Sequence, residues 1–242
     1  MSRPLADQAV IVTGAAQGLG AAIARRFEAE GARLVLMDYN AAGLAAVATD
    51  CGPLAIPIQV DLSDAADTDR AIAAALAELG SVDTLVHNAA ILERKLFADE
   101  DFASFTKTLN VGLQAGFQLS RAVWPGMAAK RAGAIIFVSS RSGIQGFAEE
   151  SAYCASKHAL EGLAKTLAME GEAHGITANT ITPGMYMHTP MSERNYSEEL
   201  KQKWVDPIKL TSAFMHLAEQ RDHALSGLRQ DAWQLSQQVD SP

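Results

Sequence analysis

The chain has 242 residues, of which 48% are hydrophobic and 20% are charged, and this composition suits one large soluble domain with its own core. Its formal net charge of −8 argues against nucleic acids and anionic membranes as partners, because both are bound by basic surfaces. The sequence contains no apolar run of about 18 residues that could span a membrane, and its polar start is unlike a signal peptide.

The first forty residues predict a strand, a glycine-rich turn, a helix and a second strand. A β-branched run at 9–12 is typical of a buried strand, and it leads into the glycine-rich turn at 13–20. An amphipathic helix is expected over 21–30, followed by a strand over 33–37 that ends at Asp38. This order is typical of dinucleotide binding, because glycines let the backbone approach a pyrophosphate and the helix N-terminus offers it free N–H groups.

Asp38 predicts which dinucleotide is bound. Its carboxylate can accept hydrogen bonds from the ribose hydroxyls of NAD and would repel the 2′-phosphate of NADP. The neighbouring residues Ala16, Gln17 and Tyr39 supply no cation for such a phosphate. The sequence therefore predicts NAD as the cofactor.

Strands and helices continue to alternate through the rest of the chain. Two prolines, Pro53 and Pro57, favour an outer position in the sheet for one of these strands. The pattern predicts one α/β domain over 1–242, a Rossmann-like, doubly wound parallel sheet of about seven strands with helices on both faces. The further strands are expected at 54–60, 82–86, 134–138 and 176–181, and the further helices at 44–48, 64–79, 99–130 and 151–174.

Tyr153 and Lys157 are four residues apart, which places a phenol and an ammonium group on one face of the predicted helix. A nearby cation favours the phenolate, so we expect the pKa of Tyr153 to be lowered from its usual value of about 10. Such a tyrosine can take a proton from an alcohol or return one to an alkoxide. Ser140, upstream of the helix, could hold the substrate oxygen beside it.

Taken together, these motifs resemble those of the short-chain dehydrogenase/reductase family. The glycine-rich turn at 13–20 fits the family pattern T-G-x-x-x-G-x-G, and the sequence at 153–157 matches Y-x-x-S-K. Residues 87–90 are similar to the family's N-N-A-G, but His87 and Ala90 replace the first asparagine and the glycine. The family's catalytic serine, adenine-contacting acid and P-G pair correspond to Ser140, Asp61 and Pro183-Gly184.

The resemblance implies a role for each matched residue. Asn110 could complete a proton relay, or it could simply cap or bridge a break in a helix. Ser139 could face the pocket instead of Ser140. The implied catalytic residues are Ser140 to orient the substrate, Tyr153 as general acid/base, Lys157 to support it, and Asn110. The residues implied in cofactor binding are Gly14, Gln17, Gly18, Leu19, Gly20, Asp38, Asp61, Leu62, Asn88, Ala89, Tyr153, Lys157, Pro183, Gly184, Tyr186 and Thr189. Those expected to contact the substrate are Ser140, Ser142, Ile144, Tyr153 and Met185.

Beyond Gly184 the resemblance weakens. The segment at 185–210, here called the lid segment, resembles the family's substrate lid. Thr189 stands one position later than the threonine that contacts nicotinamide in the family. A helix is expected to end within 217–223, and 227–233 could form the last strand, without the acidic-Gly-Gly sequence of many relatives.

The sequence thus predicts an enzyme that transfers a hydride between NAD(H) and a small secondary alcohol or ketone. Three alternatives are open: a catalytically silent NAD-binding regulator, an NADP-preferring carbonyl reductase, and an epimerase or dehydratase of the same fold. The resemblance implies a homo-oligomer, a tetramer or a dimer, formed through the two long helices. Two separated cysteines, Cys51 and Cys154, favour free thiols in the cytoplasm, and the scattered histidines indicate no metal site.

Overall fold

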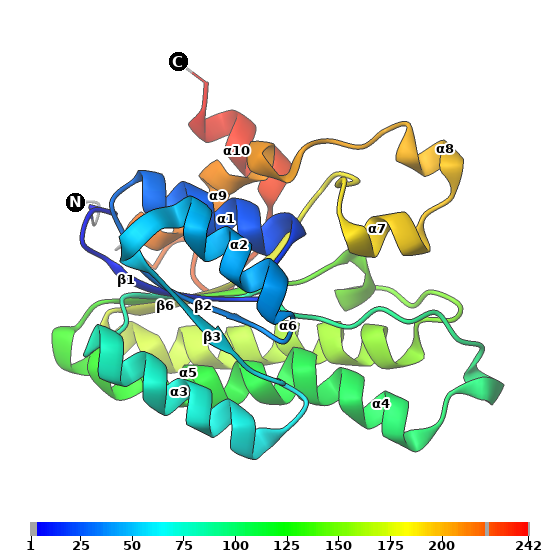
Figure 1. The fold of residues 1–242 in the computed structure, drawn as a ribbon, viewed down its shortest axis with the longest axis horizontal. Helices are drawn as coiled ribbons and strands as arrows, with labels where there is room; N and C mark the ends of the chain where they lie inside the picture. The colour runs from blue at the N-terminus through cyan, green and yellow to red at the C-terminus, as the bar shows by residue number, and fades with distance from the viewer. Residues whose placement is uncertain (1–3, 221–222, 242) are drawn as a thin grey trace.

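Seven parallel strands form one sheet at the centre of the structure, a computed structural model that describes residues 4–220 and 223–241 (Figure 1). Their order is β3-β2-β1-β4-β5-β6-β7, so the winding direction reverses between β1 and β4, and ligands of open α/β sheets bind at such a point. The predicted doubly wound sheet is confirmed. The strands are β1 (Ala9–Thr13), β2 (Arg33–Asp38), β3 (Ala55–Gln59), β4 (Thr84–His87), β5 (Gly133–Val138), β6 (Ile176–Thr182) and β7 (Arg229–Asp231).

Helices cover both faces of the sheet (Figure 1), and a buried apolar cluster of side chains lies on each side of it. Alternate residues of β1 enter opposite clusters: Val10 and Val12 pack in one, Ala9 and Ile11 in the other. One face carries α1 (Gly18–Ala29), α2 (Ala41–Cys51), α9 (Thr211–Glu219) and α10 (Ala232–Val239). The other face carries α3 (Ala65–Leu79), α4 (Phe102–Leu109), α5 (Ala115–Lys130) and α6 (Ser151–Gly171).

The strand with two nearby prolines lies where the sequence predicts. β3 is an outer strand and pairs with β2, with Pro57 opposite Leu36. Proline has no backbone N–H to donate, so an edge position costs the sheet the fewest hydrogen bonds.

The long helical region expected over 99–130 is confirmed from Phe102 onward, and it contains a π-helical turn. α4 ends at Leu109, a π-helical turn spans Asn110–Gln114, and α5 follows. The carbonyl of Gly112 in this turn is bound by the ring Nε2 of His87 at 2.9 Å. Gly112 also lies against Ser156 of α6, where an added Cβ would be 2.2 Å from the serine Oγ. The turn therefore lets α4 and α5 pack against two neighbouring elements at once.

The C-terminal strand is shorter than the sequence predicts. It covers Arg229–Asp231 instead of 227–233, because the Asp231 carboxylate accepts from the N–H of Gln234 at 3.0 Å and starts α10. The lid segment holds two short helices, α7 (Pro190–Asn195) and α8 (Glu198–Lys201), which project beyond the sheet on the side where α1 begins (Figure 1). None of the helices in the described residues is long and apolar enough to cross a membrane.

Candidate active site

A cleft of about 900 Å³ lies at the carboxyl ends of the strands. The glycine-rich turn forms part of its wall, and Tyr153 and Lys157 of α6 form another part. The structure thereby brings most of the predicted site residues together. Those that line the cleft are Gly14, Gln17, Gly18, Leu19, Asp38, Asp61, Leu62, Asn88, Ala89, Ser140, Ser142, Tyr153, Lys157, Pro183 and Thr189.

Six predicted site residues are described but do not line this cleft, namely Gly20, Asn110, Ile144, Gly184, Met185 and Tyr186. Gly20 packs behind the turn, where an added Cβ would lie 2.1 Å from the carbonyl oxygen of Gly14. Ile144 is 57% exposed. Gly184 has a φ of +76° and is packed against the Asp231 side chain. Asn110 donates from Nδ2 to the carbonyl of Ser63 at 3.0 Å.

The glycine-rich turn has the backbone conformation and the free N–H groups that an anion requires. Gly14 and Gly18 have φ angles of +64° and +56°, which glycine adopts without strain. Asn88 holds the turn by donating from Nδ2 to the carbonyls of Thr13 and Gly14 at 3.2 and 3.1 Å. The N-cap residue of α1, Gln17, makes no side-chain capping bond, so the first N–H groups of this helix are available to a pyrophosphate.

His87, which departs from the family pattern, contacts the start of this turn through the hydroxyl of Thr13. It is buried, and its Nδ1 lies 3.0 Å from the Thr13 hydroxyl. That hydroxyl also accepts from the N–H groups of Asn88 and Ala89, so it must donate its own proton to His87. The other ring nitrogen, Nε2, then donates to Gly112. Burial lowers the pKa of His87 to about 4, which keeps the ring neutral in this arrangement.

The carboxylates of Asp38 and Asp61 also line the cleft. Asp38 accepts from the N–H of Ala16 at 3.0 Å through one oxygen and from the N–H of Asn40 at 2.9 Å through the other. Asp61 accepts from the hydroxyl of Ser63 at 2.7 Å and from its N–H, and these bonds hold the pKa of Asp61 below its ordinary value. Both groups can accept further hydrogen bonds from hydroxyl or amino groups of a ligand.

Thr189 at the start of the lid segment lies against the glycine-rich turn. It is buried, its hydroxyl accepts from the N–H of Ser192 at 3.1 Å, and it caps α7. A Cβ added at Gly18 would meet its methyl group at 3.1 Å. The lid segment and the turn after β1 are therefore in contact at this threonine.

Tyr153 and Lys157 stand on one face of α6 at the far end of the cleft. The Lys157 ammonium lies 5.4 Å from the centroid of the Tyr153 ring and donates to the carbonyl of Val138 at 2.6 Å. Burial lowers the pKa of Lys157 to about 8, and the Glu161 carboxylate opposes this shift. The spacing expected from the sequence is confirmed.

The expected lowering of the Tyr153 pKa is wrong for this structure. Burial raises the pKa of Tyr153 well above its ordinary value, and a hydrogen bond with Ser140 only partly opposes the shift. Burial disfavours a charged phenolate because the phenolate loses its hydration. Tyr153 is therefore a neutral phenol at neutral pH, a form that can donate a proton.

Of the two serines after β5, Ser140 is the one that contacts the phenol of Tyr153. Ser139 is almost fully buried, and its hydroxyl donates to Glu161 at 2.5 Å. The Ser140 hydroxyl donates to Ser142 at 3.3 Å, and the Ser142 hydroxyl donates to the Glu150 carboxylate at 2.9 Å. A short chain of hydroxyl groups thus connects Ser140 to a carboxylate.

Sequence reasoning missed several lining residues. Glu150 stands three residues before Tyr153, a helical spacing that could have indicated a shared surface. Tyr196, in the lid segment, reaches the same cleft and packs edge-on against Tyr186 with their ring centroids 5.6 Å apart. No local signal pointed to Tyr196, because only the folding of the lid segment brings it to the cleft.

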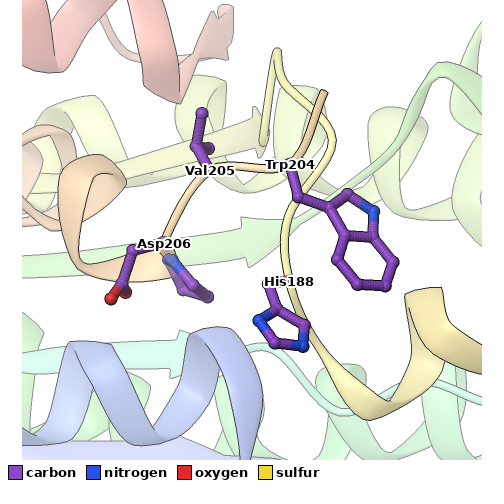
Figure 2. Close-up of a pocket in the computed structure, with 5 residues that line it drawn as sticks. His188, Trp204, Val205 and Asp206 are labelled. Atoms are coloured by element: carbon purple, nitrogen blue, oxygen red, sulfur yellow. The ribbon is translucent and has the colours of Figure 1, made fainter. Parts of the chain in front are cut away.

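A second, smaller pocket of about 270 Å³ lies within the lid segment and shares no lining residue with the cleft (Figure 2). His188 from the stretch before α7 stacks on Trp204 from the stretch after α8, with ring centroids 4.6 Å apart. His188 also pairs with Glu193 at 2.9 Å. These contacts join the two ends of the lid segment.

The chain matches known proteins over most of its length. Residues 8–200 match the model of the short chain dehydrogenase family. A 2,5-dichloro-2,5-cyclohexadiene-1,4-diol dehydrogenase of Sphingobium indicum is 34% identical over 239 residues, which cover 94% of this chain and 95% of that protein. An L-xylulose reductase of Mesocricetus auratus is 36% identical over 204 residues, which cover 84% of this chain and 81% of that protein.

Solved structures agree with the fold. A Beutenbergia cavernae protein described as an NAD(P)-dependent gluconate 5-dehydrogenase, with NADP bound at low occupancy, superposes with a TM-score of 0.87 at 27% identity, covering 96% of this chain and 99% of that chain. A 3-ketoacyl-(acyl-carrier-protein) reductase from Brucella melitensis, complexed with NADH, gives a TM-score of 0.87 at 26% identity, covering 94% of this chain and 97% of that chain.

Proposed function

This chain belongs to the short-chain dehydrogenase family, and we propose that it is an NAD-dependent oxidoreductase that interconverts a secondary alcohol and its ketone. One observation carries the proposal: the glycine-rich turn and the set Ser140, Tyr153 and Lys157 line the same cleft. A dinucleotide held at the turn and a substrate oxygen held at Ser140 would then share one enclosed space. The names of the two sequence relatives, a diol dehydrogenase and a ketose reductase, support alcohol–ketone chemistry.

The residues of the cleft fit a nicotinamide dinucleotide. The positive φ of Gly14 and Gly18 and the uncapped start of α1 suit a pyrophosphate. Asp38, with Tyr39 and Asn40 beside it in the cleft, presents acceptors and no cation, which favours the ribose hydroxyls of NAD over a 2′-phosphate. One structural neighbour holds NADP and another NADH, and a comparison of turnover with NAD and with NADP tests the preference of this chain.

When bound, the nicotinamide ring would supply the carbon that accepts or gives the hydride. The chain's own task is to position the substrate oxygen and to move a proton. The Ser140 hydroxyl orients that oxygen beside Tyr153. In ketone reduction the neutral Tyr153 phenol gives its proton to the developing alkoxide, and in alcohol oxidation the phenolate takes it. The raised pKa of Tyr153 keeps the phenol as its resting form.

Lys157 and Asn110 assist without touching the reacting carbon. The buried Lys157 ammonium lies beside the Tyr153 ring and stabilises the phenolate when it forms. Asn110 begins the π-helical turn of the α4–α5 region and is tied to the loop after Asp61 through Ser63. In this proposal the turn gives solvent protons a route toward Lys157.

The lid segment is proposed to close over the substrate, which would exclude water from the reaction. We also propose a homo-oligomer, a tetramer or a dimer, formed through α5 and α6. Phe117 on α5 is 49% exposed and Trp124 is half-buried, whereas Leu119 is fully buried in the core. Sedimentation of the purified protein measures its mass, and a monomer would contradict the proposed assembly.

The proposed function is tested with the Tyr153→Phe variant. We expect turnover of secondary alcohols with NAD to fall by about 1,000-fold or more, because the acid/base group is removed. NADH binding, measured by fluorescence titration, should stay within about twofold of the wild-type affinity. A variant that keeps most of its rate contradicts the assignment of Tyr153. Wild-type turnover with NADP but not with NAD would contradict the proposal that Asp38 selects NAD. Binding of NAD without turnover of any alcohol would favour the alternative of a catalytically silent regulator.

A further inference from the structure

Glu150 places a carboxylate beside the proposed reaction centre. It lines the cleft together with Ser140, Ser142, Tyr153 and Tyr196. Its Oε2 accepts a hydrogen bond from the Ser142 hydroxyl at 2.9 Å, and that hydroxyl accepts from Ser140. This carboxylate therefore faces any substrate whose oxygen reaches Ser140 and Tyr153.

The backbone before α6 directs this side chain toward the cleft. Glu149 has a φ of +67°, a left-handed conformation that costs a non-glycine residue about 1 kcal/mol or more. The carbonyl of Glu149 accepts from the N–H of Lys95 at 3.0 Å, and its carboxylate pairs with Arg94 at 3.1 Å. These contacts hold Glu149 toward the 94–95 loop, while Glu150 contacts Ser142.

Glu150 has unused hydrogen-bonding capacity. Ser142 donates to its Oε2 at 2.9 Å, whereas a carboxylate can accept about four hydrogen bonds. Among the described residues, no ion pair involves Glu150, although the neighbouring Glu149 forms one. A carboxylate with free lone pairs in a partly buried cleft favours a ligand that donates an O–H or N–H hydrogen bond to it. The same negative charge repels a second anion.

Two cationic side chains close to Glu150 in the chain have other contacts, and Lys107 and Arg194 also line the cleft. Arg94 is paired with Glu149, and the Arg141 guanidinium lies over the ring of Phe147 at 5.5 Å. The substrate end of the cleft is instead rich in hydroxyl groups, from Ser140, Ser142 and the two tyrosines. Together with the Glu150 carboxylate, these hydroxyls suit a ligand that carries several hydroxyl groups.

We propose that the substrate carries a second hydroxyl group, which donates to the Glu150 carboxylate while the reacting hydroxyl is held by Ser140 and Tyr153. Glu150 thus selects neutral diols and polyols, or the corresponding hydroxyketones, over simple alcohols and over hydroxy acids. The inference rests on the proposed oxidoreductase function and specifies the substrate class for it. Ser142 is the positioning residue that orients the Glu150 carboxylate.

The test uses four-carbon substrates that share a secondary alcohol: butan-2-ol, butane-2,3-diol, threitol and 3-hydroxybutanoate. We expect wild-type kcat/KM with NAD to be at least about tenfold higher for the diol or the tetrol than for butan-2-ol, and lowest for the acid. Glu150→Ala should lose roughly 10- to 100-fold on the preferred substrate and change little on butan-2-ol, because only the second hydroxyl loses its partner. Glu150→Gln should raise the relative rate on 3-hydroxybutanoate, since the repelling charge is gone.

The matched control is Glu170→Gln, which removes an exposed carboxylate on α6 that does not line the cleft. It should keep the wild-type order of substrates. A readout independent of turnover is calorimetric binding of threitol to the protein with NADH, which Glu150→Ala should weaken by a similar factor.

The outcomes separate this inference from the proposed function. Equal losses on all four substrates in Glu150→Ala, or a wild type that prefers butan-2-ol or the acid, overturn the role of Glu150 while the oxidoreductase function stands. Silence of the wild type on every substrate, with NADH bound, overturns the proposed function, and the inference is lost with it.

Discussion

Arg229 in the last strand donates from Nη2 to the backbone carbonyl of Ser140 at 3.1 Å, although 89 positions separate them in the sequence. Its Nε also lies 3.3 Å from the Glu161 carboxylate on α6. Glu161 in turn accepts from the hydroxyls of Ser139 and Thr180. A buried polar network therefore fixes the backbone of the substrate-orienting serine to the helix that carries Tyr153 and Lys157.

Replacing Arg229 should weaken both the fold and the reaction. Arg229→Gln removes the cation that lies 3.3 Å from the buried Glu161 carboxylate, which we expect to lower the unfolding free energy by about 2–3 kcal/mol. The freed Ser140 backbone should reduce kcat/KM by about tenfold, with NADH affinity unchanged. Urea denaturation and steady-state kinetics measure the two effects.

The double variant Arg229→Gln/Glu161→Gln is the control for this network. It removes both charges, so at least half of the lost stability should return. If the double variant is as unstable as the sum of the two single variants, Arg229 and Glu161 do not act as a pair.

The buried Lys157 side chain should lower the unfolding free energy of the protein at neutral pH. Its pKa of about 8 in the fold lies below the ordinary value of 10.5, so between these values the unfolded state binds more protons and stability rises with pH. Near pH 7 the cost of the buried charge is fully present, on the order of 3 kcal/mol. Lys157→Met removes this cost but leaves the Val138 carbonyl without its donor, at about 1 kcal/mol.

The expected net effect of Lys157→Met is a gain of about 2 kcal/mol near pH 7, with loss of activity. Thermal denaturation should show the gain shrinking toward about pH 10. The matched control, Lys165→Met, changes an exposed lysine on the same helix and should alter stability little. A destabilised Lys157→Met protein at neutral pH would contradict the reasoning.

His87 should make the fold sensitive to acid. Its pKa of about 4 lies below the ordinary 6.5, so between these values the unfolded state binds more protons and stability falls as the pH falls. The loss across this window should reach about 3 kcal/mol. His87→Asn should remove this dependence of the unfolding free energy on pH, whether or not the variant is less stable near pH 7. The control variant His174→Gln changes an exposed histidine and should keep the dependence. Unfolding free energies measured at several pH values decide this, and an unchanged slope in His87→Asn refutes the assignment.

Gly20 should tolerate no side chain. A Cβ there would lie 2.1 Å from the Gly14 carbonyl and 2.7 Å from Asn88 Nδ2, so Gly20→Ala must displace the turn proposed to bind the pyrophosphate. We expect NADH affinity to fall at least about 100-fold and the melting temperature to drop. Gly162→Ala in α6 has open space around it and should stabilise the protein by about 0.5–1 kcal/mol. Normal NADH binding by Gly20→Ala would rule out this packing argument.

Much of the fold is predictable from local patterns. The β-branched run at 9–12, the glycine-rich turn and Asp38 predicted β1, the turn and β2, because strand periodicity and glycine conformations depend on nearby residues. The same holds for the spacing of Tyr153 and Lys157 on α6. The π-helical form of the turn at Asn110–Gln114 was not predicted, and the carbonyl of Gly112 within it is bound by His87 on a distant strand.

The sequence by itself determined the doubly wound sheet, the turn proposed to hold a dinucleotide and the identity of the proposed proton-transfer residues. Only the tertiary structure decided that Glu150 and Tyr196 share the cleft, that Arg229 supports Ser140, and that the pKa of Tyr153 is raised. The physical reason is that burial and long-range contacts set these properties. Desolvation depends on everything that packs around a group, whereas helix and strand periodicity depend on a few residues on either side of it.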